Sequence, residues 1–188
     1  MTDEFKSLVR RCLNGSQAAM IDLVECYRSQ VFGLCYRMLN QRQDAEDMTQ
    51  ETFVRVLKNL HRWDDERPFE PWLLAIAGNR CRTMLAARRR RPVSSSLVEH
   101  LPDERPDEQQ ARRLTEEVEC VLVQLREEYR QAFLLFHDQQ LSYVEIASAM
   151  DCPVGTAKTW VHRARRELAG HLRQRGTLEE TSHAVRNV

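Results

Sequence analysis

The stretch that decides the fold is LSYVEIASAMDCPVGTAKTWVHRARREL, residues 141–168. Ser142 and Glu145 stand in the S-x-x-E order of a capping box, which predicts a helix that begins sharply. A short turn follows this helix, and Pro153 then fits the first turn of a second helix, because its φ is fixed in the helical range. The pattern therefore predicts two short helices joined by a tight turn, which is a helix-turn-helix.

The second helix of this motif separates apolar side chains from cationic ones. Its apolar residues recur at spacings of three and four, which predicts one narrow buried stripe of Val154, Ala157, Val161, Ala164 and Leu168. The side chains that face away from the stripe are Thr156, Lys158, Thr159, His162, Arg163 and Arg166. A helix of this width fits the DNA major groove, where Lys158 and Arg163 can donate to guanine edges. The motif predicts binding to duplex DNA; a solvated basic helix in a bundle is the alternative interpretation.

The charges of the whole chain are balanced but segregated. Its 188 residues include 28 basic and 28 acidic side chains, so the formal net charge is zero. The segment from Arg80 to Arg91 is basic, the segment from Glu99 to Glu119 is mostly acidic, and the segment from Pro153 to Arg175 is basic again. Two cationic surfaces with an acidic spacer between them suit a protein that meets a polyanion at two places.

The basic segment in the first half ends a predicted helix, WLLAIAGNRCRTMLAARRRR, residues 72–91. Four consecutive arginines exceed what the C-terminal end of a helix needs to offset its dipole, so we expect a nucleic-acid contact here. The preceding loop, residues 61–71, carries two aromatic side chains, Trp63 and Phe69. Because aromatic rings stack on unpaired bases and arginines follow the backbone, this region is a candidate to bind single-stranded DNA.

The domain organisation follows from where helical periodicity stops. Almost every periodic segment has the helical period, and none shows the alternation of a strand. Residues 92–111 are rich in proline, serine and acids and interrupt the pattern. The predicted fold is therefore all-α, with two small helical domains, 1–91 and 112–175, joined by a flexible acidic linker. The second domain is the helix-turn-helix, and residues 176–188 form a tail too short for a domain.

Several classes of protein are excluded or disfavoured. No apolar run approaches the roughly 18 residues of a membrane span, and the N-terminus lacks the order of a signal peptide. We therefore expect a cytoplasmic protein without membrane insertion. The six cysteines form no CxxC pair and no histidine cluster accompanies them, which indicates buried thiols and no metal or cofactor. No P-loop, GxSxG or HExxH motif is present, so we expect no enzyme activity.

Three segments, in this order along the chain, resemble a sigma factor of the sigma-70 family, of the small two-domain extracytoplasmic-function (ECF) type. DAEDMTQETFVRVLKNL, residues 44–60, resembles the helix that docks on the RNA polymerase clamp. Residues 67–91 resemble the segment that melts DNA and recognises the minus-ten element, and residues 141–168 resemble the helix-turn-helix that recognises the minus-thirty-five element. The resemblance implies promoter-specific initiation by core RNA polymerase, bound through its clamp helices and flap. It also implies an anti-sigma factor as a partner, with catalysis left to the polymerase.

The resemblance also assigns roles to residues by their position. The polymerase contacts would be Asp47, Gln50 and Glu51. Minus-ten recognition and melting would involve Trp63, Phe69, Asn79, Arg80, Arg82, Arg88 and Arg89, with the loop from Trp63 to Phe69 holding a flipped base. The minus-thirty-five element would be met by Thr156, Lys158, Thr159, His162, Arg163 and Arg166. Trp160 departs from the family pattern, which often has arginine there, and either packs on the DNA backbone or widens the apolar stripe.

Two other functions are weighed against this one. A stand-alone helix-turn-helix regulator would need a sensory or receiver domain, and residues 1–91 lack the alternating strands and helices of a receiver. Asp64 and Asp65 near His61 could form a metal nuclease site, although acids in a polar loop are usually just solvated. Run-off transcription with and without added core polymerase would separate these functions.

Overall fold

The structure is a computed structural model, and it describes residues 3–90 and 117–174. The predicted linker (92–111) and tail (176–188) lie outside the described residues. Every regular element in the described ranges is a helix, which confirms the all-α prediction.

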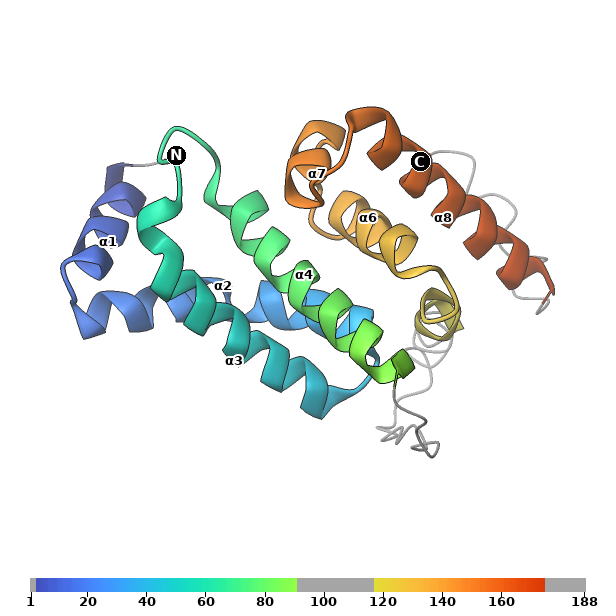
Figure 1. The fold of residues 1–188 in the computed structure, drawn as a ribbon, viewed down its shortest axis with the longest axis horizontal. Coiled ribbons are helices and arrows are strands. Elements are labelled where there is room, and N and C mark those ends of the chain that lie inside the picture. Colours follow the sequence, from blue (N-terminus) through green and yellow to red (C-terminus); the bar gives the residue numbers. More distant parts are fainter. Residues whose placement is uncertain (1–2, 91–116, 175–188) are drawn as a thin grey trace, which may run out of the picture.

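The first domain is built from the helices α1 (Asp3–Leu13), α2 (Gln17–Leu39), α3 (Arg42–Asn59), η1 (Leu60–Arg62) and α4 (Phe69–Arg90). Ser16 caps α2 by accepting the N–H of Ala19, and Asn40 ends it in the left-handed conformation at φ 52°. The sequence suggested a break near Ser29, but α2 is continuous there. The helices α2, α3 and α4 pack against one another, and α1 covers the start of α2 (Figure 1).

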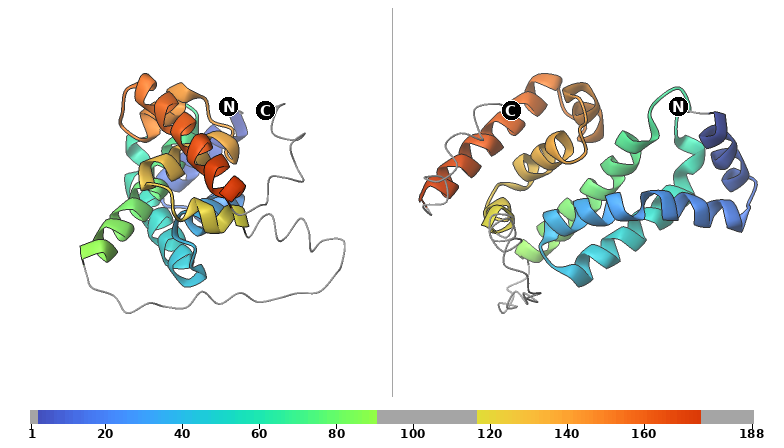
Figure 2. Two further views of the ribbon diagram at one scale, coloured as in Figure 1. Left: turned by 90° about the vertical axis from the view of Figure 1, so that its right-hand side faces the viewer. Right: turned by 180° about the vertical axis from the view of Figure 1, so that it is seen from behind.

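The second domain contains α6 (Glu127–His137), α7 (Tyr143–Ala149) and α8 (Val154–Gln174), preceded by a helical segment at 117–122. The predicted capping box is present. The Ser142 hydroxyl accepts the Glu145 N–H at 3.3 Å, and the Ser142 N–H donates to the Glu145 carboxylate at 2.8 Å. The views in Figure 2 show α7 and α8 joined by a short turn, with α6 packed against both. The predicted helix-turn-helix is therefore confirmed.

The buried stripe of α8 starts later than the sequence suggested. Ala157, Val161 and Ala164 are buried, whereas Val154 at the first turn is 38% exposed. Leu168 is half-buried, and Leu172 carries the stripe to the end of the helix. The side chain of Val154 is therefore open to solvent at the first turn of α8.

The expectation of buried thiols holds for three cysteines. Cys12, Cys35 and Cys81 are buried, whereas Cys26 is exposed and Cys120 and Cys152 lie between these extremes. Within residues 3–90 and 117–174, no cluster of three or more metal-binding side chains occurs. None of the helices in the same ranges is long and apolar enough to cross a membrane.

Removal of the Ser142 hydroxyl should destabilise the second domain. Ser142→Ala leaves a backbone N–H at the start of α7 without its acceptor, which costs about 1 kcal/mol of unfolding free energy. Chemical denaturation followed by circular dichroism measures this loss. Ser148→Ala is the matched control, because Ser148 is exposed in the same helix. Equal losses in the two variants would contradict a capping role for Ser142.

Candidate nucleic-acid and polymerase interface

The outer face of α8 carries the predicted DNA contacts. Thr156 is half-buried, and the other five predicted residues are exposed, namely Lys158, Thr159, His162, Arg163 and Arg166. The structure therefore brings the whole predicted set to one accessible side of the second helix of the motif. Exposed donors on such a helix face can approach both base edges and phosphates.

Two of these cations rest on aromatic rings of neighbouring helices. The Arg163 guanidinium donates to the Tyr129 hydroxyl at 2.8 Å and lies 5.9 Å from the centre of the same ring. The Lys158 ammonium lies 5.7 Å from the centre of the Tyr143 ring. Such exposed cation–π contacts contribute only about 0.5–1 kcal/mol, so both side chains can leave their rings for a stronger anionic partner.

Another cation of this segment, Arg165, lies on the inner side of α8. It donates to the Nε2 atom of His137 at 2.9 Å and lies 5.0 Å from the Phe136 ring centre. Trp160 is also half-buried against the core, which agrees with the interpretation that it widens the apolar stripe. Arg165 therefore attaches α8 to α6.

The second domain should lose stability in mild acid because of His137. Burial and, secondarily, the charge of Arg165 lower the pKa of this imidazole from its ordinary value. Protonation of His137 is therefore less favourable in the folded domain than in the unfolded chain, where the pKa is about 6.5. The full stability of the domain is present above that pH and is lost as the pH falls toward the lowered pKa of the folded state. Thermal unfolding between pH 7.5 and pH 5 measures this loss. His137→Gln retains an acceptor but does not titrate, and an unchanged pH profile in that variant would contradict the assignment.

A groove on the first domain lies between α3, η1 and α4 and has a volume of about 350 Å³. Its lining includes three arginines, Arg55, Arg62 and Arg80, together with Asn79 and the half-buried Trp72. Asn79 and Arg80 were predicted from the sequence, whereas Arg55, Arg62 and Trp72 were not. The groove combines cations with one accessible aromatic ring, which is the composition that binds single-stranded nucleic acid.

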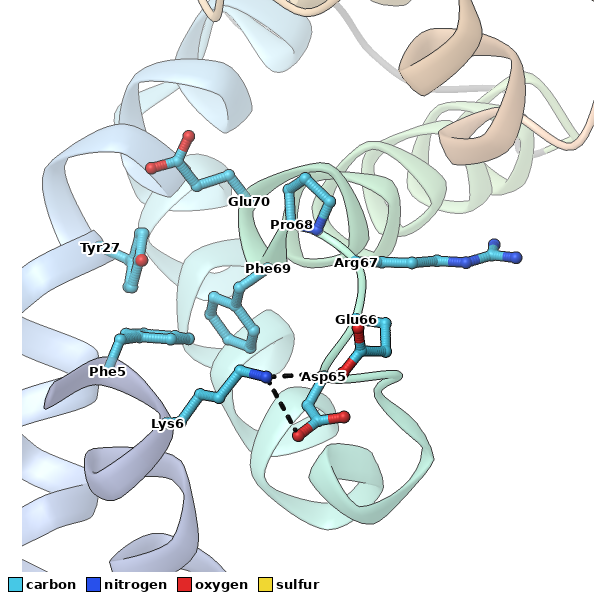
Figure 3. Close-up of a pocket in the computed structure, with 9 residues that line it drawn as sticks. All are labelled: Phe5, Lys6, Tyr27, Asp65, Glu66, Arg67, Pro68, Phe69 and Glu70. Carbon is cyan, nitrogen blue, oxygen red and sulfur yellow. Dashed lines mark ion pairs between the residues drawn. The ribbon is translucent and has the colours of Figure 1, made fainter. Parts of the chain in front are cut away.

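Trp63 and Phe69 are not placed to stack on bases. Their exposed fractions are 8% and 2%, and their ring centres lie 5.3 Å apart in an edge-to-face contact. Phe5 and Tyr27 belong to the same aromatic cluster, with ring centres 5.1 Å and 5.3 Å from that of Phe69 (Figure 3). The structure therefore corrects the prediction for these two residues. The loop folds back so that both rings enter the core, and their faces are covered by other side chains.

The same loop borders an open cavity of about 620 Å³. Figure 3 shows Lys6 of α1 reaching across to the loop, where it pairs with Asp65 at 3.5 Å and Glu66 at 3.7 Å. Burial, followed by the charge of Glu70, raises the pKa of Tyr27 to about 12, so its hydroxyl remains protonated. The exposed edge of the loop is therefore polar. The aromatic cluster beneath it, which includes Phe5, Tyr27 and Phe69, holds the loop in place.

The predicted arginines of α4 all have partners within the chain. These pairs are Arg80 with Glu51 at 2.8 Å, Arg82 with Asn79, Arg88 with Asp44, and Arg89 with Glu127 at 3.1 Å. Three of the four partners are acids, and Glu127 belongs to the second domain. Phosphate groups would therefore have to compete with these acids for the arginines.

Comparison with known proteins decides the family. Residues 23–91 match sigma-70 region 2, and residues 115–168 match sigma-70 region 4. The chain is 31% identical over 185 residues to the ECF RNA polymerase sigma factor SigW of Bacillus subtilis (strain 168), with 89% of this chain and 96% of SigW covered. The chain belongs to the sigma-70 family. It is also 32% identical over 176 residues to the RNA polymerase sigma-H factor of Pseudomonas aeruginosa, with 87% of this chain and 91% of that protein covered.

Two solved structures share the fold of this sigma factor. CnrH, in complex with the cytosolic domain of CnrY, superposes with a TM-score of 0.68 at 24% identity, covering 89% of this chain and 96% of CnrH. RpoE of Bartonella quintana, in complex with the anti-sigma factor NepR, gives a TM-score of 0.65 at 20% identity, covering 81% and 95%. The chain therefore shares its all-α fold with CnrH and with the sigma factor RpoE.

The residues of this sigma factor that were predicted to contact polymerase lie on α3. Asp47 and Gln50 are exposed, whereas Glu51 accepts from Arg55 at 3.2 Å and Arg80 at 2.8 Å. Glu51 therefore faces the basic groove more than the surrounding solvent. Val54 is 51% exposed and follows Gln50 by one helical turn. Val54 was not predicted as a contact residue. The sequence did offer a sign of it, namely an apolar residue on the otherwise polar outer face of α3.

Proposed function

We propose that this sigma factor binds core RNA polymerase and directs it to promoters by contacting two DNA elements, one with each domain. Residues 1–91 would meet the minus-ten element and residues 112–175 the minus-thirty-five element, with 92–111 as the connection. The observation that carries the proposal is the presence of two separate cationic surfaces, on α4 and on α8, in a chain of this family. A regulator that binds a single operator needs only one of them.

The outer face of α8 would enter the major groove. The first turns of a recognition helix reach the base edges, so Lys158, Thr159 and His162 are placed for base contacts. Arg163 would join them after leaving the Tyr129 ring, and Arg166, farther along the helix, would contact phosphate. Thr156, which is half-buried, would lie at the edge of this surface.

The groove between α3 and α4 would hold the opened strand of the minus-ten element. Trp72 supplies the ring on which a base can stack, in place of the buried Trp63 and Phe69. Asn79 and Arg80 lie beside it. Arg82, Arg88 and Arg89 would contribute to phosphate binding once DNA competes with their intramolecular partners.

Asp47 and Gln50 would contact the clamp helices of the polymerase, together with the exposed Val54. An apolar side chain surrounded by polar ones is the composition of a small protein–protein contact. Glu51 would serve this contact indirectly, because its carboxylate already holds Arg55 and Arg80.

The sigma factor would have no catalytic activity of its own and would act in the cytoplasm beside the polymerase, which performs the chemistry. We also propose that an anti-sigma factor binds it. The proposal is supported by the solved structure of the sigma factor RpoE, which has the same fold and is in complex with the anti-sigma factor NepR.

Run-off transcription tests the proposed function. We expect specific transcripts only when both the sigma factor and core polymerase are present, and weak promoter binding by the sigma factor alone. Equally tight promoter binding with and without polymerase would favour a stand-alone regulator.

Replacement of Trp72 should slow promoter melting. Trp72→Ala removes the proposed stacking platform, which costs about 1 kcal/mol, or roughly fivefold in strand opening. Permanganate footprinting of unpaired thymines measures the opened fraction. Trp63→Phe is the control, because it keeps an aromatic ring in the core. Slower melting in Trp63→Phe with normal melting in Trp72→Ala would reverse the assignment.

A further inference from the structure

A cation on the proposed DNA-binding face of α8 rests on an aromatic ring of α7. The Nζ atom of Lys158 lies 5.7 Å from the centre of the Tyr143 ring. An aromatic ring attracts an ammonium group within about 6 Å of its centre, because the face of the ring is electrically negative. The contact therefore joins the first helix of the helix-turn-helix to the side of the second helix that is proposed to meet DNA.

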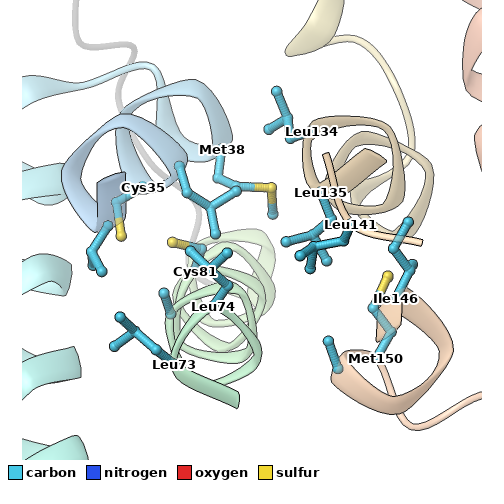
Figure 4. Close-up of a cluster of buried hydrophobic side chains, with 14 of the residues drawn as sticks. Cys35, Met38, Leu73, Leu74, Cys81, Leu134, Leu135, Leu141, Ile146 and Met150 are labelled. Carbon is cyan, nitrogen blue, oxygen red and sulfur yellow. The ribbon is translucent and has the colours of Figure 1, made fainter. Parts of the chain in front are cut away.

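The backbone that carries Tyr143 is fixed by the start of α7. Tyr143 is the first residue of this helix and directly follows Ser142, which caps it. Leu141 and Ile146, before and after it, are buried, and Figure 4 shows both side chains in the cluster of buried apolar residues. Because side-chain direction follows from the backbone, the direction in which Tyr143 leaves α7 is fixed as well.

The Tyr143 ring is itself restrained by α6. It stacks on Phe136, with ring centres 4.8 Å apart and an angle of 24° between the planes. Arg165 of α8 lies 5.0 Å from the centre of the Phe136 ring. Tyr143 is half-buried in this arrangement. It therefore offers Lys158 a contact surface whose position varies little.

A lysine that binds DNA benefits from such a surface. An exposed lysine side chain samples many rotamers, and the freedom that it loses on binding opposes the contact. A cation–π contact at an exposed site raises the population of the rotamers on the ring by about two- to fivefold. The ammonium carries three N–H donors, so contact with a ring on one side leaves donors for a base on the other.

We propose that Tyr143 is a positioning residue for recognition of the minus-thirty-five element: its ring holds the Lys158 ammonium in place while that group donates to a base edge. This inference rests on the proposed function, in which Lys158 contacts the upstream element. Tyr143 carries no charge, so it sets the strength of one base preference and leaves the general attraction to phosphate unchanged.

A double-mutant cycle in the holoenzyme tests the positioning role, with promoters that carry single substitutions in the upstream element. Tyr143→Leu removes the ring and should weaken binding by about two- to fivefold. It should relax preference at the same base position as Lys158→Ala, and it should have no further effect when added to Lys158→Ala. The salt dependence of binding should stay that of the wild type in Tyr143→Leu, because Lys158 keeps its charge. Tyr143→Phe is the matched control, since it keeps the ring and should bind like the wild type.

A second replacement covers the case in which Tyr143→Leu does not fold, as judged by circular dichroism. Pentafluorophenylalanine at position 143 has nearly the shape of phenylalanine, but its fluorines make the face of the ring positive. This protein should bind about two- to fivefold more weakly than Tyr143→Phe, because the ring no longer attracts the ammonium.

Three results would overturn the positioning role. They are equal binding by the phenylalanine and pentafluorophenylalanine proteins, a Tyr143→Leu loss that persists in the Lys158→Ala background, and a loss shared alike by all promoter sequences. If Lys158→Ala itself keeps the wild-type preference profile, the proposed contact of Lys158 with the upstream element fails, and the positioning role fails with it. If Lys158→Ala changes the profile and the Tyr143 variants do not, the positioning role alone fails.

Discussion

Replacement of Arg130 by leucine is expected to lower the free energy of unfolding by about 3 kcal/mol. Three backbone carbonyls lose their hydrogen-bond donor, and each buried carbonyl left without one costs about 1–3 kcal/mol. Arg130 is 4% exposed, and its guanidinium donates to the carbonyls of Met38, Val123 and Leu125. Met38 belongs to the first domain, so this side chain links both domains. Burial lowers the pKa of Arg130 to about 10, which still leaves it charged near neutral pH.

Urea denaturation of the full chain measures this loss. Arg126→Leu is the matched control, because Arg126 lies four residues earlier with its side chain 63% exposed and pairs with Glu128 at 2.9 Å. An exposed pair of this kind contributes little to stability, because water solvates both side chains. Arg130→Lys should remain strongly destabilised, because a single ammonium cannot reproduce the planar fork of donors. A loss in Arg130→Leu no greater than in Arg126→Leu would contradict the bridging role.

The elements of the fold that were predicted correctly are those with local causes. The capping box of Ser142 and Glu145 and the turn before Pro153 involve residues within a few positions of one another. The errors arose where packing overrides local preference. Ser29 lies inside a continuous α2, and Val154 is exposed although it has the spacing of the buried stripe.

The candidate site was predicted less well, because side-chain burial depends on partners far along the chain. Two aromatic residues in a polar loop look the same in the sequence whether they face solvent or the core. Trp63 and Phe69 are buried because Phe5 and Tyr27, from α1 and α2, meet them. Arg80 likewise gains a partner, Glu51, from a different helix.

The contact between the domains had no signal in the sequence. Gly78 lies in the middle of a helix, where glycine costs about 1 kcal/mol relative to alanine and suggests only a weak point. The structure explains this glycine, because the side chain of Gln131 occupies the space that a Cβ atom would need.

Removal of both Lys158 and Arg163 should nearly abolish recognition of the upstream promoter element. Each base-edge contact is worth about 1–3 kcal/mol, so Lys158→Ala/Arg163→Ala should lower holoenzyme affinity by about 100-fold and relax base preference at two positions. The two residues are about 140° apart around the helix axis, and both avoid the stripe of Ala157, Val161 and Ala164. Both can therefore enter one groove, whose walls curve around the helix.

Arg166→Ala should behave differently, because a phosphate contact carries no sequence information. The variant should bind all promoter sequences more weakly by the same factor. The slope of log affinity against log salt concentration should become shallower by about one.

Tyr129→Phe provides the control for Arg163, since it removes the hydroxyl that accepts from the guanidinium at 2.8 Å but keeps the ring. If Arg163 leaves this ring to contact a base, Tyr129→Phe should leave the base preferences intact and bind no more weakly than wild type. The assay is holoenzyme binding to promoters with single substitutions in the upstream element, at two salt concentrations. A wild-type preference profile in the Lys158→Ala/Arg163→Ala protein would show that this face of α8 does not enter the groove, since no other change to the helix accompanies the loss of the two cations.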